Sequence, residues 1–268
     1  PLPGWSMAKS LTATLVGILV NRGKLDVFAP GAVPEWRQDP EAAQVTVDQL
    51  LRMTSGLDVA ENNTGADPNT RMLFDEPDAA AYAAGRGLRA MPGTRWEYMS
   101  GSTVLASRVV VRATGGTLLS SQQFVREALF GPLGAASFVV EPDLAGTFIG
   151  SSFALANAQD WAKLGQLYLN DGVWNGRRLL PRNWREYVTQ HTALSGAASY
   201  GAGFWTLEHD ERTRVPVDPF YASGFQGQTV AAIPSRHLVV VRLGAGYPSG
   251  RWRFVEDVVA AQRLAADR

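Results

Sequence analysis

The tetrapeptide Ser6-Met7-Ala8-Lys9 stands directly before the longest apolar run of the chain, residues 11–20. Four apolar residues at helical spacing link the two segments on one face: Met7, Leu11, Leu15 and Ile18. Arg22 and Gly23 supply a cation for the last turn and a glycine for the helix end. The run is too short for a transmembrane helix, and no small-residue cleavage site follows it as in a signal peptide. It therefore predicts an amphipathic core helix and no membrane span.

Ser6 and Lys9 are three residues apart, so they are neighbours on one face of this helix. Both lie in the first turn, where free N–H groups and the helix dipole favour developing negative charge. A lysine beside an apolar face tends toward its neutral form, and a neutral amine can accept the proton of a serine hydroxyl. An N-cap serine next to a lysine that extends to solvent explains the same residues equally well. The spacing alone leaves both interpretations open.

The composition of the 268-residue chain removes other kinds of chemistry. Because cysteine is absent, there is no disulfide, thiolate nucleophile or sulfur-ligated zinc site, and the compartment stays undetermined. The 25 basic residues balance the 25 acidic ones, so we expect no nucleic-acid partner. No phosphate-binding loop or dinucleotide motif occurs, so we predict no cofactor. His191, His209 and His237 lack metal-ligand spacing, and we predict no metal site; a Ser-His-Asp triad stays open as an alternative.

Most of the remaining chain is predicted to be helical in the middle and β-stranded near the end. The spacing of Ala, Leu and Val predicts helices at residues 46–53, capped by Thr46, and at 77–84, 103–114, 120–129, 158–170 and 181–190. Runs rich in β-branched and aromatic residues predict antiparallel strands at 203–207, 229–233 and 238–243. We expect a last helix, 252–266, to pack on that sheet.

Several motifs follow Ser6-x-x-Lys9 in order along nearly the whole chain: Leu50-Leu51-Arg52-Met53-Thr54-Ser55-Gly56-Leu57, Pro92-Gly93-Thr94, Tyr98-Met99-Ser100-Gly101, Pro132-Leu133-Gly134, residues 160–165, and Gly224-Phe225-Gln226-Gly227-Gln228 before Ile233-Pro234. Their order and intervals resemble the serine β-lactamase and penicillin-binding-protein superfamily, in its branch of esterases and 6-aminohexanoate-dimer hydrolases. The resemblance implies an α+β, β-lactamase/transpeptidase-like fold, in which helices flank an antiparallel sheet. Residues 1–25 and 172–268 would form this α/β domain, and residues 26–171 a mostly helical one.

The resemblance also implies a mechanism. Ser6 would attack a carbonyl carbon and form an acyl-enzyme, while Lys9 and Tyr98 relay the proton to the leaving group. Tyr98 would open the family's Y-x-N motif, whose third position here is Ser100, a residue able to hydrogen-bond the substrate or Lys9. The N–H groups of Ser6 and Phe225 would form the oxyanion hole. Without the resemblance, Tyr98 is better interpreted as a packed aromatic.

The third family motif, K-T-G, corresponds to Ala222-Ser223-Gly224 and lacks its lysine. The resemblance gives that lysine the role of anchoring the carboxylate of β-lactams and peptidoglycan stems, while Ser223 and Gly224 would lie beside the substrate. We therefore predict a serine hydrolase of carboxylic esters or linear amides. One alternative is a β-lactamase or DD-peptidase with a substitute cation, for which the candidates are Arg212, Arg214 and Arg242. A second is a catalytically silent binding relative.

In the family that the chain resembles, a helix and two strands precede the nucleophile helix, whereas Ser6 stands near the first residue here. We therefore expect N-terminal strands to be missing and one sheet edge to be uncovered. Besides a small ester or amide substrate, the expected partners are such an N-terminal segment or a second copy of the chain.

Overall fold

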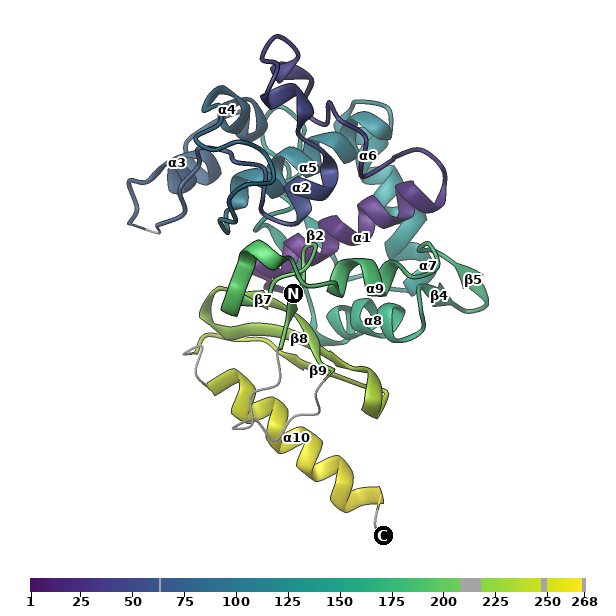
Figure 1. Ribbon diagram of the computed structural model, residues 1–268. Helices are drawn as coiled ribbons and strands as arrows, with labels where there is room; N and C mark the ends of the chain where they lie inside the picture. Colours follow the sequence, from purple (N-terminus) through teal and green to yellow (C-terminus); the bar gives the residue numbers. More distant parts are fainter. Residues whose placement is uncertain (63, 208–217, 247–249, 267–268) are drawn as a thin grey trace.

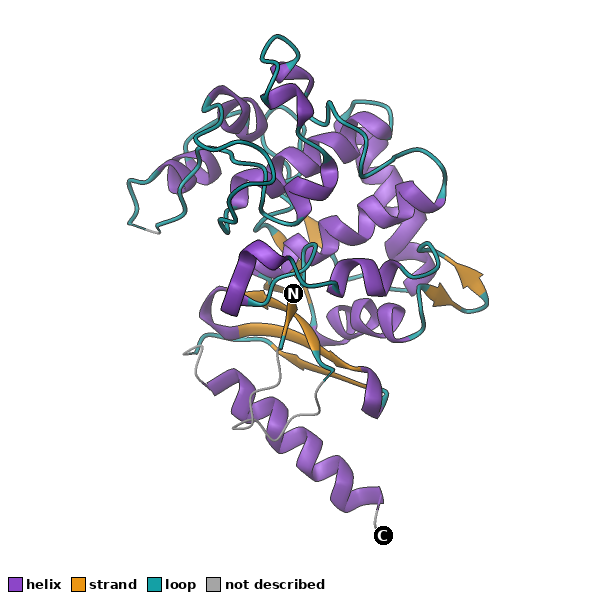
Figure 2. Ribbon diagram, in the orientation of Figure 1, coloured by secondary structure: helices purple, strands orange, loops and turns teal. Residues whose placement is uncertain are grey.

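Helix α1 (Ala8–Asn21) lies between a group of helices and an antiparallel sheet. Figure 1 shows the computed structural model, which describes residues 1–62, 64–207, 218–246 and 250–266. Helices α2 to α6 gather on one side of α1, and strands β7 to β9 with helix α10 lie on the other (Figures 1 and 2). These helices are α2 (Val47–Leu51), α3 (Pro68–Phe74), α4 (Ala79–Gly85), α5 (Ser100–Ala113), α6 (Leu118–Val125) and α10 (Gly250–Ala266). Three more helices are α7 (Gly131–Leu133), α8 (Ala158–Leu169) and α9 (Trp184–Thr189).

The sequence at the start of the chain predicts α1 correctly. All residues from Ala8 to Leu19 are buried, including Lys9, and the helix ends at Asn21 before Gly23, whose φ of 66° suits glycine. Because both sides of α1 are covered, the helix is buried around its circumference rather than along a single stripe. It therefore buries Lys9 at the centre of the molecule, with Ser6 in the turn directly before the helix.

The main sheet has the order β6-β7-β8-β9, with every pair antiparallel. Its strands are β6 (Trp205–Thr206), β7 (Phe220–Gly224), β8 (Gln228–Ile233) and β9 (Leu238–Arg242). Side chains alternate between its two faces as a period of two requires. Phe220, Ala222, Val230 and Ala232 join the main core, and Tyr221, Ala231, Ile233 and Val240 pack with Val255 and Val259 of α10.

Helix α8 covers the face of the sheet opposite α10. Its contact with β8 and β9 is close at Gly165, where a Cβ atom would lie 2.7 Å from Val239 and 3.1 Å from Val230. On the other face, Val255 and Val259 of α10 pack on the strands, which confirms the predicted packing of the last helix on the sheet. The contact of α8 with the sheet crosses the domain boundary expected at residue 171, and the division into two domains stays a prediction.

Several elements differ in extent from the predictions. The strand expected at 203–207 is confined to Trp205–Thr206, and the helix expected at 46–53 ends at Leu51 because Met53 adopts a left-handed φ of 62°. The helix expected at 120–129 starts at Leu118 and changes into a π-helical turn, Arg126–Phe130. The residue pattern did not predict β7, and it did not predict five short strands: β1 (Leu2–Pro3), β2 (Val139–Val140), β3 (Ala154–Ala156), β4 (Val173–Trp174) and β5 (Arg177–Arg178).

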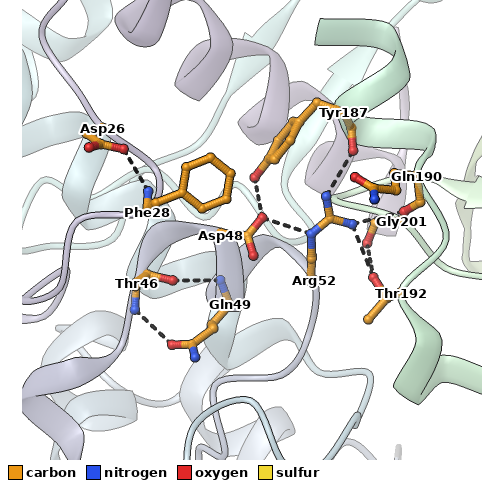
Figure 3. A network of polar contacts seen from close by, with 10 residues as sticks. All are labelled: Asp26, Phe28, Thr46, Asp48, Gln49, Arg52, Tyr187, Gln190, Thr192 and Gly201. Atoms are coloured by element: carbon orange, nitrogen blue, oxygen red, sulfur yellow. Dashed lines mark hydrogen bonds and ion pairs between the residues drawn. The ribbon is translucent and has the colours of Figure 1, made fainter. Parts of the chain in front are cut away.

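A partly buried polar network ties α2 to α9 and the segment that follows it (Figure 3). The Arg52 guanidinium donates to Asp48 Oδ1 at 2.8 Å and to the main-chain oxygens of Tyr187 and Gln190 at 3.0 and 2.9 Å. Tyr187 donates its own hydroxyl proton to Asp48 at 2.7 Å. Burial and the neighbouring carboxylate raise the pKa of Tyr187, so this phenol stays protonated as a donor. The network fixes the helical side of the molecule to the chain that leads into β6.

Candidate active site

A cleft of about 480 Å³ lies where the end of β7, the turn before α1 and the α3 region meet. Its lining comprises Trp5, Ser6, Glu61, Asn69, Thr70, Leu73, Phe74, Tyr98, Ser100, Ser152, Trp205, Ser223, Gly224 and Phe225. The structure thus brings together six of the seven residues predicted for the site, from segments more than 200 positions apart. The seventh, Lys9, is 1% exposed and lies behind Ser6.

Ser6 belongs to a 3-10 turn, Trp5–Met7, that leads directly into α1. The N-cap of α1 is Met7 and the N-cap of the turn is Gly4, neither with a side-chain hydrogen bond, so the alternative of a capping serine is wrong. The Ser6 hydroxyl instead lies 3.0 Å from Lys9 Nζ. The burial of Lys9 likewise rules out a lysine that extends to solvent. The residue spacing of three therefore places the Ser6 hydroxyl and the Lys9 amine in direct contact, as the sequence predicts.

Lys9 Nζ has two further partners, the Ser100 hydroxyl at 3.1 Å and the main-chain oxygen of Ser151 at 3.2 Å. All three partners are uncharged oxygens, and Ser100 and Ser151 are themselves buried. An amine held this way can exist with three protons or with two, because a neutral amine still has two N–H donors and one lone pair. The geometry allows Lys9 to accept a proton from Ser6.

The ring of Tyr98 lies beside Lys9, and the distance from the ring centroid to Lys9 Nζ is 4.7 Å. The ring also packs on Tyr200 and Trp205, with centroids 5.7 and 5.1 Å away, so Tyr98 is at once a packed aromatic and a neighbour of the lysine. Burial raises the pKa of Tyr200 well above its ordinary value, and the nearby Tyr98 and Glu61 add to the rise. Tyr200 therefore stays protonated behind the site, and Tyr98 is the member of the pair that lines the cleft.

The end of β7 approaches the turn that carries Ser6 very closely. A Cβ atom on Gly224 would lie 2.0 Å from the main-chain oxygen of Gly4, so only glycine fits there. Two residues with left-handed backbone flank this contact, Trp5 before Ser6 with φ of 50° and Gln226 after Phe225 with φ of 60°. Backbone strain of this kind persists where the surroundings enforce it. This contact holds the end of β7 against the turn that carries Ser6, and Ser6 and Phe225 both line the cleft beside it.

Ala222, at the position of the family's lysine, is 2% exposed and takes no part in the cleft lining. Of the substitute cations considered, Arg242 donates to the main-chain oxygens of Gly227 and Gly244 at 2.9 and 3.2 Å. Arg212 and Arg214 lie outside the described residues. Within the described chain, Arg242 is thus engaged with the backbone of the β7–β8 turn rather than aimed at the cleft.

Glu61 is a residue of the cleft that the sequence analysis did not single out. Its Oε2 accepts a hydrogen bond from the Ser100 hydroxyl at 2.9 Å, so a carboxylate is linked to Lys9 through one serine. No local pattern around Glu61 marks it, because its partner is 39 residues further along the chain. The main-chain oxygen of Ser151 was missed for the same reason, since backbone acceptors leave no sequence signal.

The histidines weighed as alternatives lie away from the cleft where the structure describes them. His191 and His237 do not line the cleft, and His209 lies outside the described residues. The described part of the chain brings no three His, Asp or Glu side chains together in a metal-binding arrangement. Among its helices, none has both the length and the apolar content that a bilayer crossing requires.

Comparison with known proteins gives the family. Residues 2–263 match the beta-lactamase family. A 6-aminohexanoate-dimer hydrolase of Paenarthrobacter ureafaciens is 27% identical over 90% of this chain, and the chain spans 65% of that relative's length. A Bacillus anthracis protein provisionally named a 6-aminohexanoate-dimer hydrolase superposes with a TM-score of 0.79 at 20% identity, over 98% of this chain and 72% of its own. A family VIII carboxylesterase superposes with a TM-score of 0.71 at 20% identity, and the match covers 98% of this chain and 83% of the carboxylesterase. The chain has the β-lactamase/transpeptidase-like fold and belongs to the beta-lactamase family.

Proposed function

We propose that this chain is a serine hydrolase that forms an acyl-enzyme on Ser6. The observation that carries the proposal is the 3.0 Å contact between the Ser6 hydroxyl and the buried amine of Lys9 at the base of the cleft. In the first step Ser6 Oγ bonds to a carbonyl carbon and its proton passes to Lys9. The N–H groups of Ser6 and Phe225 stabilise the negative oxygen that results. Lys9, with Tyr98 beside it, then returns the proton to the leaving group as the carbonyl re-forms, and water later releases the acid.

The substrate class that we infer is a carboxylic ester or a linear amide. Two aromatic side chains on the lining, Phe74 and Phe225, are each 62% exposed, and Trp5 and Trp205 add further apolar surface. Such a lining suits an aliphatic or aromatic acyl chain. The relatives named above are a 6-aminohexanoate-dimer hydrolase and a carboxylesterase, which agrees with linear amides and esters. Among the described residues that line the cleft there is no cation for a β-lactam carboxylate, so a β-lactamase or DD-peptidase is the first alternative rather than the main proposal. A catalytically silent binding relative is the second alternative.

Covalent labelling and hydrolysis test the proposal together. We expect the wild-type protein to react with a fluorophosphonate probe and to hydrolyse p-nitrophenyl butyrate, and Ser6→Ala to do neither while keeping its thermal unfolding temperature. Ser120→Ala, which alters a partly exposed serine of α6 outside the cleft, is the control and should be labelled and should hydrolyse the ester as wild type does. Hydrolysis by Ser6→Ala at the wild-type rate would show that another residue is the nucleophile. A folded wild-type protein that no serine-directed probe labels would support the silent relative.

A further inference from the structure

We propose that Glu61 is a positioning residue that directs the hydrogen bonds of Lys9 through Ser100; the inference rests on the proposed role of Lys9 as the base. Glu61 and Ser100 both line the cleft, and the chain of contacts runs from Glu61 Oε2 to Ser100 Oγ at 2.9 Å and from Ser100 Oγ to Lys9 Nζ at 3.1 Å. Ser100 is 1% exposed, so bulk water does not compete for its hydroxyl.

The direction of each hydrogen bond follows from the number of protons available. A serine hydroxyl has one proton, and an ionised carboxylate can only accept. Because Ser100 gives its proton to Glu61, it can only accept from Lys9. The main-chain oxygen of Ser151 can also only accept. A neutral Lys9 therefore uses both of its N–H groups on Ser100 and Ser151, and its lone pair is left facing the Ser6 hydroxyl, which is the arrangement that proton removal from Ser6 requires.

Without an acceptor at position 61, the Ser100 proton is free to turn toward the Lys9 lone pair. In that arrangement the Lys9 lone pair accepts a hydrogen bond from Ser100, and the Ser6 hydroxyl must compete with Ser100 for the same lone pair. The loss falls on the chemical step, since the cleft walls that bind substrate stay in place. A direct role of Glu61 in holding a cationic substrate group makes the opposite prediction, because removing it would then raise KM and the effect would not depend on Ser100.

The test is a double-mutant cycle on p-nitrophenyl butyrate, an uncharged substrate. We expect Glu61→Leu to lower kcat by about tenfold to 100-fold, with KM within about twofold, the size expected for losing a hydrogen bond to a charged group. Glu61→Gln should retain kcat within about threefold, because its amide oxygen can still accept from Ser100. Adding Glu61→Leu to Ser100→Ala should change kcat by less than about twofold, because Glu61 acts through Ser100. Glu41→Leu, at an exposed glutamate outside the cleft, is the matched control and should keep wild-type kinetics.

Three results would overturn the inference: wild-type kcat in Glu61→Leu, effects of the two substitutions that multiply in the double variant, or a loss confined to KM. If Glu61→Leu fails to fold, Glu61→Ala measured with and without formate serves instead, since formate can accept the Ser100 hydrogen bond. Rescue of kcat by formate supports the inference, and its absence in folded Glu61→Ala contradicts it. Failure of the proposed function is separate, because the wild-type protein itself would then neither hydrolyse the ester nor take the fluorophosphonate label.

Discussion

Replacing Gly224 with alanine perturbs the contact between β7 and the turn that carries Ser6. The new Cβ would lie 2.0 Å from the Gly4 main-chain oxygen and 3.0 Å from the Gln228 Cβ, whereas ordinary contacts begin at 3.4 Å. Neither neighbour is the end of a flexible side chain, so the main chains must separate by about 1.4 Å. Because Ser6 lies two residues after Gly4 and Phe225 follows Gly224 directly, we expect the same movement to displace both expected oxyanion donors. A misplacement of about 1 Å costs about 100-fold in rate, so we expect kcat/KM to fall by about that factor.

The assay is hydrolysis of p-nitrophenyl butyrate together with thermal unfolding. Gly224→Ala should also lower the free energy of unfolding by about 1–3 kcal/mol, the usual cost of overpacking. Gly85→Ala is the matched control, because a Cβ there meets nothing within 4 Å and the residue ends helix α4, so its kinetics and unfolding should match wild type. Wild-type kcat/KM in Gly224→Ala would refute the idea that this close approach sets the geometry of the site.

Three further outcomes follow from the described contacts. Ala222 stands where the family's lysine would bind the carboxylate of a β-lactam, so we expect kcat/KM for nitrocefin to be about tenfold to 100-fold below that for p-nitrophenyl butyrate. Absorbance assays measure both constants, and rapid nitrocefin turnover would contradict this expectation. Arg52→Ala should lower the free energy of unfolding by about 1.5–3 kcal/mol in urea titrations, because Asp48 loses a partly buried hydrogen bond between charged groups. Arg185→Ala, in an exposed pair, should change it by less than about 1 kcal/mol, and equal effects would argue against the network. Burial raises the pKa of Asp67, but its hydrogen bonds more than offset this and lower the pKa to about 2. The stabilisation by Asp67 is then complete above pH ~4 and lost toward pH ~2, so the unfolding temperatures of wild type and Asp67→Asn should converge over that interval; a constant gap would show that the carboxylate charge plays no part.

The centre of the fold could be predicted from the sequence because its signals are local. The spacing of Ser6 and Lys9 and the apolar run after them determine α1, and β8 and β9 follow from their β-branched residues. Thr46 was predicted as a cap, and it accepts from Gln49 in a capping box. Each of these features is complete within about ten residues, which is the range over which periodicity and capping act.

What the sequence did not reveal depends on contacts between distant segments. Strands β1 to β5 have two or three residues each, too few for an alternating pattern. The π-helical turn at Arg126–Phe130 has the same apolar spacing as the helix that it continues. Ala222 to Gly224 were placed beside the site through the family resemblance, and nothing in their own pattern requires it. Glu61 acquires its significance only when the fold brings it to Ser100.

The identity of the nucleophile is the central claim, and mapping the covalent adduct tests it most directly. The protein would be labelled with a fluorophosphonate, digested, and its peptides sequenced by mass spectrometry. Four serines line the cleft, Ser6, Ser100, Ser152 and Ser223. Ser6 and Ser100 both contact the buried Lys9, but the Ser100 hydroxyl donates its proton to Glu61, which leaves Ser6 as the expected nucleophile. We predict a single adduct on Ser6, lost in Ser6→Ala. An adduct on another serine of the cleft, with Ser6 unmodified, would contradict the account.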